Sequence, residues 1–322
     1  MDRSKEILAY LRSAHDYISG DHMSSNMGIS RTAIWKYINH LEQLGYKISK
    51  LKGKGYRLLT SPDKLYAWEI ERYCKTNMIG KKIIYKDGVD STNAFAFRLA
   101  FGGEAEGTCI IAESQDAGKG RLGRKWFSPI GKNLYISIVL RPHIPPSNVY
   151  PITFLSSLAV YDTIKALITD FEPVLKWPND VLVDSRKICG TLLELSTEAD
   201  MIRFVIVGIG LNINMGENDI EKEIKHKATS LFMLTKKSFE RSMVCGILLT
   251  NIERYYSIFM EKGPDEICSI WEERAKIKGK HLEIIQMGET YKGISEGIDR
   301  DGGIILAIDG KTKKIIAGDV SF

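Results

Sequence analysis

Residues 117–126, Ala-Gly-Lys-Gly-Arg-Leu-Gly-Arg-Lys-Trp, place the strongest constraint on how this chain can fold. Glycines alternate with cationic side chains in this run, so the segment has almost nothing to bury in a core. We therefore expect a surface loop between two regular elements. The glycines leave backbone N–H groups open to a ligand, and Arg121 and Arg124 can each bind two oxygens of a phosphate or carboxylate. The run predicts an anion-binding loop that is mobile until an anion orders it; a solvated basic surface loop is the alternative.

The elements expected around this loop form a central domain over residues 63–273. Consecutive strands joined by short turns indicate an α+β domain with a mixed, largely antiparallel sheet flanked by helices. No G-x-G-x-x-G run follows a strand in the way that a dinucleotide-binding fold requires. The expected helices cover 63–74, 94–101 and 151–167, and 218–270 is expected to be mostly helical. The expected strands cover 83–86, 108–112, 134–140 (half-buried), 174–177, 181–183, 190–195 and 204–209.

Residues 1–62 predict a winged helix-turn-helix domain. Three helices are expected, and Ser30 is a good N-cap for the third. A hairpin tipped by Gly53-Lys54-Gly55 follows as the wing, and residues 60–63 are expected to be a linker because proline there disfavours regular structure. The expected helices cover 4–17, 22–27 and 31–44, and the expected hairpin strands cover 46–51 and 56–59.

Positive charge is concentrated in this N-terminal domain. Residues 1–60 hold ten Lys or Arg and five Asp or Glu, whereas the rest of the chain is electrically balanced. Such an uneven distribution favours contact with a polyanion. We expect the third helix to enter the major groove of DNA and the wing lysines to reach phosphates; a domain used only for protein contacts is the alternative. The expected DNA-binding residues are Ser30, Arg31, Thr32, Trp35, Lys36, Lys52 and Lys54.

Three further clusters in the central domain carry polar or glycine residues in patterns that suit a ligand. In the run 176–180, Lys-Trp-Pro-Asn-Asp, the Asp180 carboxylate could hold nucleotide-bound Mg²⁺, although an ordinary β-turn is an equal alternative. The run 186–190 is a cationic turn that enters a buried strand, and a lone turn lysine is usually solvent-exposed. In the run 208–214, glycines and asparagines close an apolar strand, which suits close contact with a flat ring.

Together the motifs resemble those of one family, in matching order over nearly the full chain. They are DSTN (90–93), GKGRLGRKWFSP (118–129), NLY (133–135), KWPND (176–180), RKICG (186–190) and GIGLNIN (208–214). The chain is similar to the bifunctional biotin–[acetyl-CoA-carboxylase] ligase/biotin operon repressors. Lipoate ligases, which are similar in fold, lack the glycine–arginine loop. The resemblance implies a class II synthetase-like ligase domain beside the DNA-binding domain.

The resemblance also implies roles for individual residues. Lys187 would contact the biotin carboxylate and the forming acyl phosphate, with Arg121 and Arg124 as the other catalytic cations. Where the family's loop commonly has arginine this chain has Lys119, which keeps the charge but loses the two-pronged geometry. The biotin site would comprise Ser91, Thr92, Asn93, Gln115, Gly118, Lys119, Gly120, Arg121 and Lys187. The ATP and adenylate site would comprise Trp126, Lys176, Asn179, Asp180, Gly208, Gly210 and Asn212.

The reaction that the resemblance implies brings two anions together. A biotin carboxylate attacks the α-phosphate of ATP, so cations and Mg²⁺ must offset the repulsion and the charge of the transition state. A lysine of a biotin carboxyl carrier protein then takes the biotinyl group. Biotin is thus both a substrate and the precursor of a corepressor, and we expect the adenylate-bound protein to be a homodimer on operator DNA. Two alternatives are a ligand-sensing transcription factor without turnover and a lipoate-type acyl ligase.

Residues 274–322 change character and predict a small β-barrel. Short strands are expected over 282–286, 293–298, 303–308 and 313–317, with glycine-containing turns over 287–290 and 308–311. The resemblance implies that this module helps to engage ATP and the acceptor.

The bulk sequence points to an ordinary cytoplasmic protein. No apolar run approaches the ~20 residues needed to span a bilayer, and the N-terminus has no apolar signal-peptide region. The five cysteines are scattered, their number is odd and no C-x-x-C pair occurs. We therefore expect neither a disulfide framework nor a zinc site, and core packing for most of the thiols.

Overall fold

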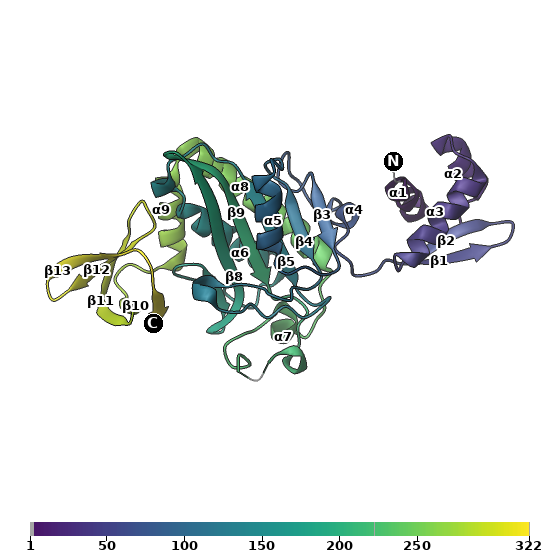
Figure 1. Ribbon diagram of the computed structural model, residues 1–322. Helices are drawn as coiled ribbons and strands as arrows, with labels where there is room; N and C mark the ends of the chain where they lie inside the picture. Colours follow the sequence, from purple (N-terminus) through teal and green to yellow (C-terminus); the bar gives the residue numbers. More distant parts are fainter. Residues whose placement is uncertain (1–2, 222, 322) are drawn as a thin grey trace. The chain divides into compact units, whose positions relative to one another are not determined.

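The computed structural model describes residues 3–221 and 223–321, which divide into two compact units (Figure 1). The first unit comprises residues 1–63 and the second comprises residues 64–322. The expected boundary after residue 62 lies one residue from this division, whereas the expected boundary after residue 273 falls inside the second unit. In the described part of the chain, no helix combines the length and apolar character needed to cross a membrane.

The N-terminal unit has three helices and a two-stranded hairpin, as predicted. Serine side chains cap two of the helices: Ser19 accepts from the backbone N–H of His22 and Ser30 from that of Ala33, both at 3.1 Å. Its core contains Ile7, Leu8 and Leu11 of α1 together with Ile34, Ile38 and Leu41 of α3. The elements are α1 (Ser4–Ser13), α2 (Gly20–Met27), α3 (Arg31–Gln43), β1 (Lys47–Leu51) and β2 (Gly55–Thr60).

The first helix is shorter than the predicted range 4–17. It ends at Ser13 because the chain beyond it is held extended: the backbone of Ile18 exchanges two hydrogen bonds of 2.9 Å with Tyr56 of β2. This close approach also explains the glycine at position 55, where a Cβ would lie 2.1 Å from the Ile18 carbonyl oxygen. Periodicity along the sequence does not reveal such a long-range bridge.

The second unit is built on a seven-stranded sheet of order β3-β4-β5-β9-β8-β7-β6. Among the described strand pairs of this sheet, only β3–β4 is parallel, so the predicted mixed, largely antiparallel sheet is confirmed. Residue 137 of β5 lies opposite Gly208 of β9, which in turn lies opposite Leu192 of β8. The strands are β3 (Ile83–Lys86), β4 (Cys109–Ala112), β5 (Leu134–Leu140), β6 (Val174–Lys176), β7 (Asp180–Val183), β8 (Arg186–Glu198) and β9 (Met201–Leu211).

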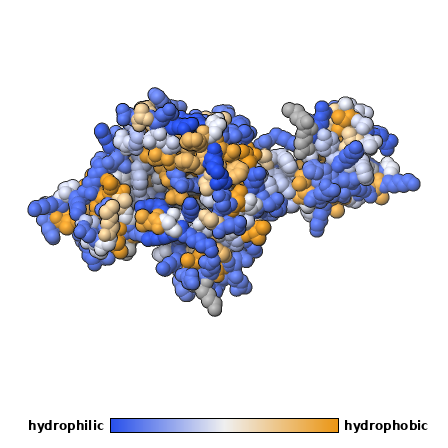
Figure 2. Space-filling view, viewed as in Figure 1, coloured by the Kyte–Doolittle hydropathy of each residue, from blue (hydrophilic) through white to orange (hydrophobic). Residues whose placement is uncertain are grey.

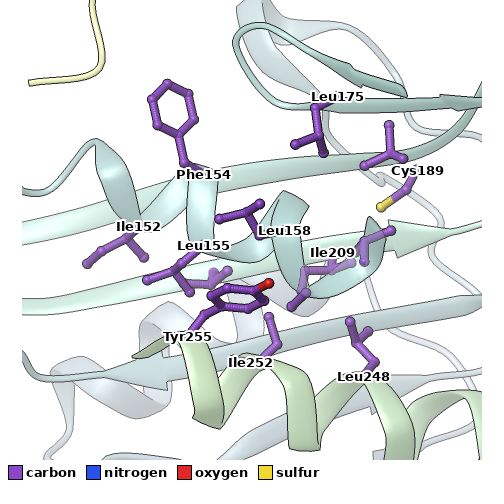
Figure 3. Close-up of a cluster of buried hydrophobic side chains, with 14 of the residues drawn as sticks. Ile152, Phe154, Leu155, Leu158, Leu175, Cys189, Ile209, Leu248, Ile252 and Tyr255 are labelled. Atoms are coloured by element: carbon purple, nitrogen blue, oxygen red, sulfur yellow. The ribbon is translucent and has the colours of Figure 1, made fainter. Parts of the chain in front are cut away.

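Helices cover both faces of this sheet. Alternate strand residues belong to two different apolar clusters: Ile110 and Val139 pack with α5 (Thr92–Phe101), whereas Ile111 and Ile138 belong to the larger cluster with α6 (Pro151–Leu167) and α8 (Arg241–Lys262). Figure 3 shows this larger cluster, with α6 and α8 side chains meeting Ile209 of β9. All seven residues of β5 are therefore buried, and the prediction of a half-buried strand was wrong.

The predicted helix over 63–74 is mostly irregular, whereas 218–270 is mostly helical, as predicted, although its first α-helix begins only at residue 231. Only α4 (Ala67–Ile70) forms within 63–74, and the residues just beyond this range donate backbone N–H groups to Thr250 and Glu253 of α8. Residues 216–230 contain no α-helix among their described residues, and the helical region begins with α7 (Leu231–Thr235) before α8 and α9 (Pro264–Ala275). All five cysteines are free and four of them are buried, as expected for core residues.

The C-terminal residues form a five-stranded antiparallel sheet of order β13-β12-β11-β10-β14. The predicted turns are present at Met287-Gly288 and Asp309-Gly310, where all four residues have positive φ angles. Among the described residues the edge strands β13 and β14 do not pair, so the sheet of the predicted small β-barrel is not shown to close. The strands are β10 (His281–Gln286), β11 (Glu289–Ile298), β12 (Ile304–Ile308), β13 (Lys311–Ile315) and β14 (Asp319–Ser321).

Candidate active site

A cavity of about 650 Å³ lies in the second unit, where the start of β8 meets the end of β9. Its lining comes from the start of α5, the glycine–cation loop of residues 117–126, the turn between β6 and β7, and these two strands. Most residues predicted for the site line it together. They are Ser91, Thr92, Asn93, Gln115, Lys119, Gly120, Arg121, Arg124, Trp126, Asn179, Asp180, Lys187, Gly208, Gly210 and Asn212.

Two predicted residues do not line this cavity. Gly118 pairs with the other end of the loop: its carbonyl accepts from Trp126 N–H at 2.8 Å, and a Cβ on it would lie 2.7 Å from the Trp126 carbonyl oxygen. Lys176 is half-buried at the end of β6, opposite Asp180 in the β6–β7 pairing. The structure therefore gives Lys176 no direct place beside a ligand of this cavity.

The glycine–cation loop folds back on itself. Gly120 N–H donates to the Arg124 carbonyl at 2.7 Å, and Lys119 and Lys125 form an isolated backbone bridge. Leu122 has a φ of 55° and is 76% exposed, so the loop adds nothing to the core, as its composition predicts. Four cationic residues of this folded loop line the cavity: Lys119, Arg121, Arg124 and Lys125.

Both loop arginines contact the C-terminal sheet at the start of β14 or at the residue before it. Arg121 Nη1 lies 3.3 Å from Asn179 Oδ1 and 3.4 Å from the carbonyl oxygen of Gly318, while Arg124 forms an ion pair with Asp319. Asp319 lines the cavity, so the C-terminal sheet contributes a side chain to it. Nothing in the local sequence around Asp319 indicated this contact, because it joins segments almost 200 residues apart.

Lys187 is held at the cavity by its neighbours. Its Nζ lies 2.6 Å from Asp180 Oδ1 and 5.3 Å from the centroid of the Trp126 ring. Its backbone N–H donates to Lys227 and its carbonyl accepts from Thr229, which fixes the main chain on that side as well. A cation fixed in this way needs little reorganisation when an anionic group binds beside it.

Glycines 190 and 210, which face each other on β8 and β9, explain why small residues are needed here. A Cβ on Gly210 would lie 2.4 Å from the Trp126 ring, and one on Gly190 would lie 2.9 Å from it. The indole Nε1 of Trp126 is buried and has no hydrogen-bond partner among the described residues. A buried donor without a partner raises the free energy of the folded protein, so a ligand acceptor that pairs with this N–H would bind favourably.

Cations outnumber carboxylates around the cavity. Asp180 and Asp319 are the acidic residues of its lining, and each is paired with one of the cations. The cationic residues are Lys119, Arg121, Arg124, Lys125, Lys187 and Lys227. Such an excess of positive charge fits a ligand with several negative charges, such as a nucleoside triphosphate.

Sequence reasoning missed several lining residues. Lys125, Phe127, Gly190 and Ile209 stand inside the motifs described above and could have been included. No motif pointed to Lys227 or Asp319, whose places depend on the tertiary fold. The lining residues outside the predicted set are Lys125, Phe127, Gly190, Thr191, Leu192, Ile209, Met215, Ile224, Lys227, Ala228 and Asp319.

The N-terminal unit carries a second concave surface, of about 630 Å³. Its lining includes Arg31, Thr32 and Trp35 of α3 and the wing lysines Lys52 and Lys54, so the structure brings these predicted residues together. Trp35 is 51% exposed, although large aromatic side chains are usually buried. The predicted Ser30 and Lys36 are exposed but do not line this surface. Figure 2 shows mainly hydrophilic side chains on the visible face of this unit.

Three family models match the chain: an HTH domain over residues 3–57, the Biotin/lipoate A/B protein ligase family over 86–212, and the Biotin protein ligase C terminal domain over 279–322. The Bifunctional ligase/repressor BirA of Bacillus subtilis (strain 168) is 36% identical over 318 residues, which cover 99% of this chain and 98% of the relative. The protein of the same description from Escherichia coli (strain K12) is 29% identical over 306 residues, 95% of this chain and 93% of the relative.

A solved structure resembles a large part of the chain. The biotin protein ligase from Aquifex aeolicus in complex with biotin and ATP has a TM-score of 0.63 and 32% sequence identity. The match covers 75% of this chain and 98% of that structure.

Proposed function

The chain belongs to the family of bifunctional ligase/repressors, and from this premise we propose which residues act in its reaction. The protein is an ATP-dependent biotin–protein ligase that forms biotinyl-5′-AMP, and its helix-turn-helix domain makes it a biotin-responsive repressor as well. The observation that supports the assignment of the site is the excess of cations around the cavity, whose lining includes glycines of β8 and β9. The roles of the individual residues follow from the need to bring two anions together, the biotin carboxylate and the phosphates of ATP.

In the first step a carboxylate oxygen of biotin forms a bond to the α-phosphorus of ATP, and the bond to the pyrophosphate breaks. Lys187 offsets the negative charge of the carboxylate and of the forming acyl phosphate, because its ammonium group is fixed beside Asp180. Arg121 and Arg124 bind the phosphate oxygens from the loop. Lys119, Lys125 and Lys227 add positive charge around the remaining phosphates.

Magnesium enters as the counter-ion of the nucleotide substrate. In the described part of the chain no cluster of three or more histidine, cysteine or acidic residues is placed to hold a metal. Asp180 and Asp319 are the carboxylates beside the cavity that could contact the nucleotide's Mg²⁺, which would lower the charge on the phosphates.

In the second step the amine of an acceptor lysine attacks the carbonyl carbon of the mixed anhydride. The new amide bond forms, the amine loses a proton and AMP leaves. Six of the loop residues between Lys119 and Trp126 line the cavity, so the loop also shields the anhydride from water until the acceptor arrives.

Transfer of biotin to a carrier domain tests this function. We expect purified protein, biotin and ATP to add one biotinyl group to a biotin carboxyl carrier domain, with release of AMP and pyrophosphate. Replacement of the acceptor lysine by arginine in the carrier is the matched control and should abolish labelling. Labelling with lipoate instead of biotin would indicate an acyl ligase of other specificity, and binding of biotin without turnover would indicate a sensor.

For the N-terminal unit we propose direct contact between the wing lysines and DNA phosphates. Replacing both Lys52 and Lys54 by alanine should weaken binding to operator and unrelated DNA alike, because phosphate contacts carry no sequence information. The slope of log affinity against log salt concentration should fall by about 2, one for each lost contact. Titrations at several salt concentrations measure this slope. Lys47→Ala, on β1 but outside the concave surface, is the control, and an unchanged slope in the double variant contradicts the assignment.

We also propose that formation of the adenylate converts the protein to a homodimer that reads two half-sites. One helix-turn-helix unit reads one half-site, and two-fold symmetry places a second unit on the other. Sedimentation velocity with biotin and ATP should therefore show a species of twice the mass, and gel shifts should show tighter operator binding than without them. Equal operator affinity in both conditions would exclude this coupling.

A further inference from the structure

A carboxylate stands on the basic concave surface of the N-terminal unit. The charged residues that line this surface are Asp21 on α2, Arg31 on α3 and the lysines Lys50, Lys52 and Lys54. Asp21 is thus the one acidic residue among the described residues of the lining. Because a carboxylate repels DNA phosphates, it lowers the affinity for DNA of any sequence. Its place on this surface therefore requires a compensating role.

Asp21 is paired with Arg31. Arg31 Nε lies 2.9 Å from Asp21 Oδ1, and neither Nη group of Arg31 donates a hydrogen bond to a residue that the structure describes. The two side chains are 73% and 66% exposed, so their ion pair contributes little to the stability of the unit. DNA that covers the pair removes water from around it, which strengthens the attraction between the two charges. We therefore expect the pair to act mainly in the complex with DNA.

Arg31 is placed to reach the edge of a base. It is the first residue of α3, and Ser30 Oγ fixes the start of this helix by accepting from the Ala33 backbone N–H at 3.1 Å. The N-terminal residues of a recognition helix are those that contact base edges. In the major groove guanine presents two neighbouring acceptors, O6 and N7, and an arginine can donate to both. The two Nη groups of Arg31 suit this pair of acceptors.

The ion pair decides between two targets for the guanidinium group. An arginine without an acidic neighbour is attracted to the nearest phosphate, and a phosphate contact carries no sequence information. Asp21 offsets the charge of Arg31 and repels phosphate, whereas the Nη groups remain able to donate to a base. The pair therefore lowers the affinity for DNA in general and raises the selectivity for one base.

We propose that Arg31 reads a guanine in each operator half-site, and that Asp21 is a positioning residue that keeps the guanidinium group of Arg31 away from the phosphates. This rests on the proposed binding of operator DNA by the N-terminal unit. The alternative is that Asp21 serves α2 alone, because a carboxylate in the first turn stabilises a helix. That role would depend neither on Arg31 nor on the sequence of the DNA.

Selection of binding sites from random DNA tests the reading of guanine. The full chain is used, with biotin and ATP present. We expect the unmodified protein to enrich a guanine at one position of each half-site and Arg31→Ala to lose that preference. Replacing this G·C pair by A·T in the selected site should weaken binding by the unmodified protein about five- to 150-fold. The same replacement should hardly change binding by Arg31→Ala, and titrations followed by fluorescence anisotropy measure both effects.

Asp21→Asn tests the positioning role, because asparagine keeps the size of the side chain but not its charge. Arg31 can then bind a phosphate, so the slope of log affinity against log salt concentration for unrelated DNA should steepen by about 1. The preference for guanine should fall at the same time. Asp16→Asn, which breaks the Asp16–Arg57 ion pair outside the concave surface, is the matched control and should change neither quantity.

A double-mutant cycle separates this mechanism from an effect on α2. Without Arg31 no new phosphate contact can form, so adding Asp21→Asn to Arg31→Ala should not steepen the slope. A steepening that persists without Arg31, or equal slopes for Asp21→Asn and Asp16→Asn, would overturn the role of Asp21. A guanine preference that survives Arg31→Ala would overturn the reading of guanine. If the unmodified protein enriched no sequence at all, the proposed binding of operator DNA would fail instead.

Discussion

Lys187→Ala is expected to slow formation of biotinyl-5′-AMP by about 10²- to 10³-fold, the usual cost of removing one group that stabilises developing charge. The loss has two parts. The ammonium group that faces the reacting carboxylate and phosphate disappears, and Asp180, which lay 2.6 Å from it, is left as an uncompensated anion beside two anionic substrates. We expect the fall mainly in kcat, because the stabilised charge develops in the transition state.

Pyrophosphate release with biotin and ATP, without any acceptor protein, measures this step alone. Arg186→Ala is the matched control, since it removes the neighbouring cation on β8, which does not line the cavity. Adding Asp180→Asn to Lys187→Ala should recover part of the rate, because it removes the repelling carboxylate. Near-normal pyrophosphate release from Lys187→Ala would defeat its assignment.

The parts of the fold that sequence could predict are those decided locally. The strand β5, the helix α6 and the cap at Ser30 appear where spacing and capping residues placed them. The glycine–cation loop could be recognised because its composition excludes burial. The site motifs also come together as expected, since Ser91 caps α5 and the next residue, Thr92, binds Gln115.

The structural features that the sequence did not reveal depend on contacts between segments that are far apart in the chain. The first helix ends early because Ile18 pairs with Tyr56, and the irregular segment after α4 donates backbone N–H groups to α8. Asn93 was expected to bind biotin, yet its polar atoms are used by Ser137, Glu194 and Leu192. Each case depends on a partner more than 30 residues away, for which no local pattern exists.

One such distant contact, between Glu113 and Arg241, supports the site from inside the core. Arg241 Nη1 lies 2.8 Å from Glu113 Oε2, with exposed side-chain fractions of 1% and 0%. Glu113 Oε1 also accepts from Tyr85 Oη at 3.1 Å, and burial together with the charge of Glu113 raises the pKa of Tyr85 above its usual value. Glu113 follows β4 and precedes Gln115 by two residues, so the pair fixes the approach to the ligand-binding loop.

Arg241→Met is expected to lower the free energy of unfolding by about 3–5 kcal/mol, because it strands a buried carboxylate without its partner. Urea unfolding followed by circular dichroism measures the change. Combining it with Glu113→Leu should restore much of the loss, since an apolar pair of similar volume has no charge to desolvate. Arg254→Met removes a half-exposed arginine farther along the same helix and is the control, with an expected loss below about 1 kcal/mol. If Arg241→Met and Arg254→Met cost the same, the buried pair is not what holds this region together.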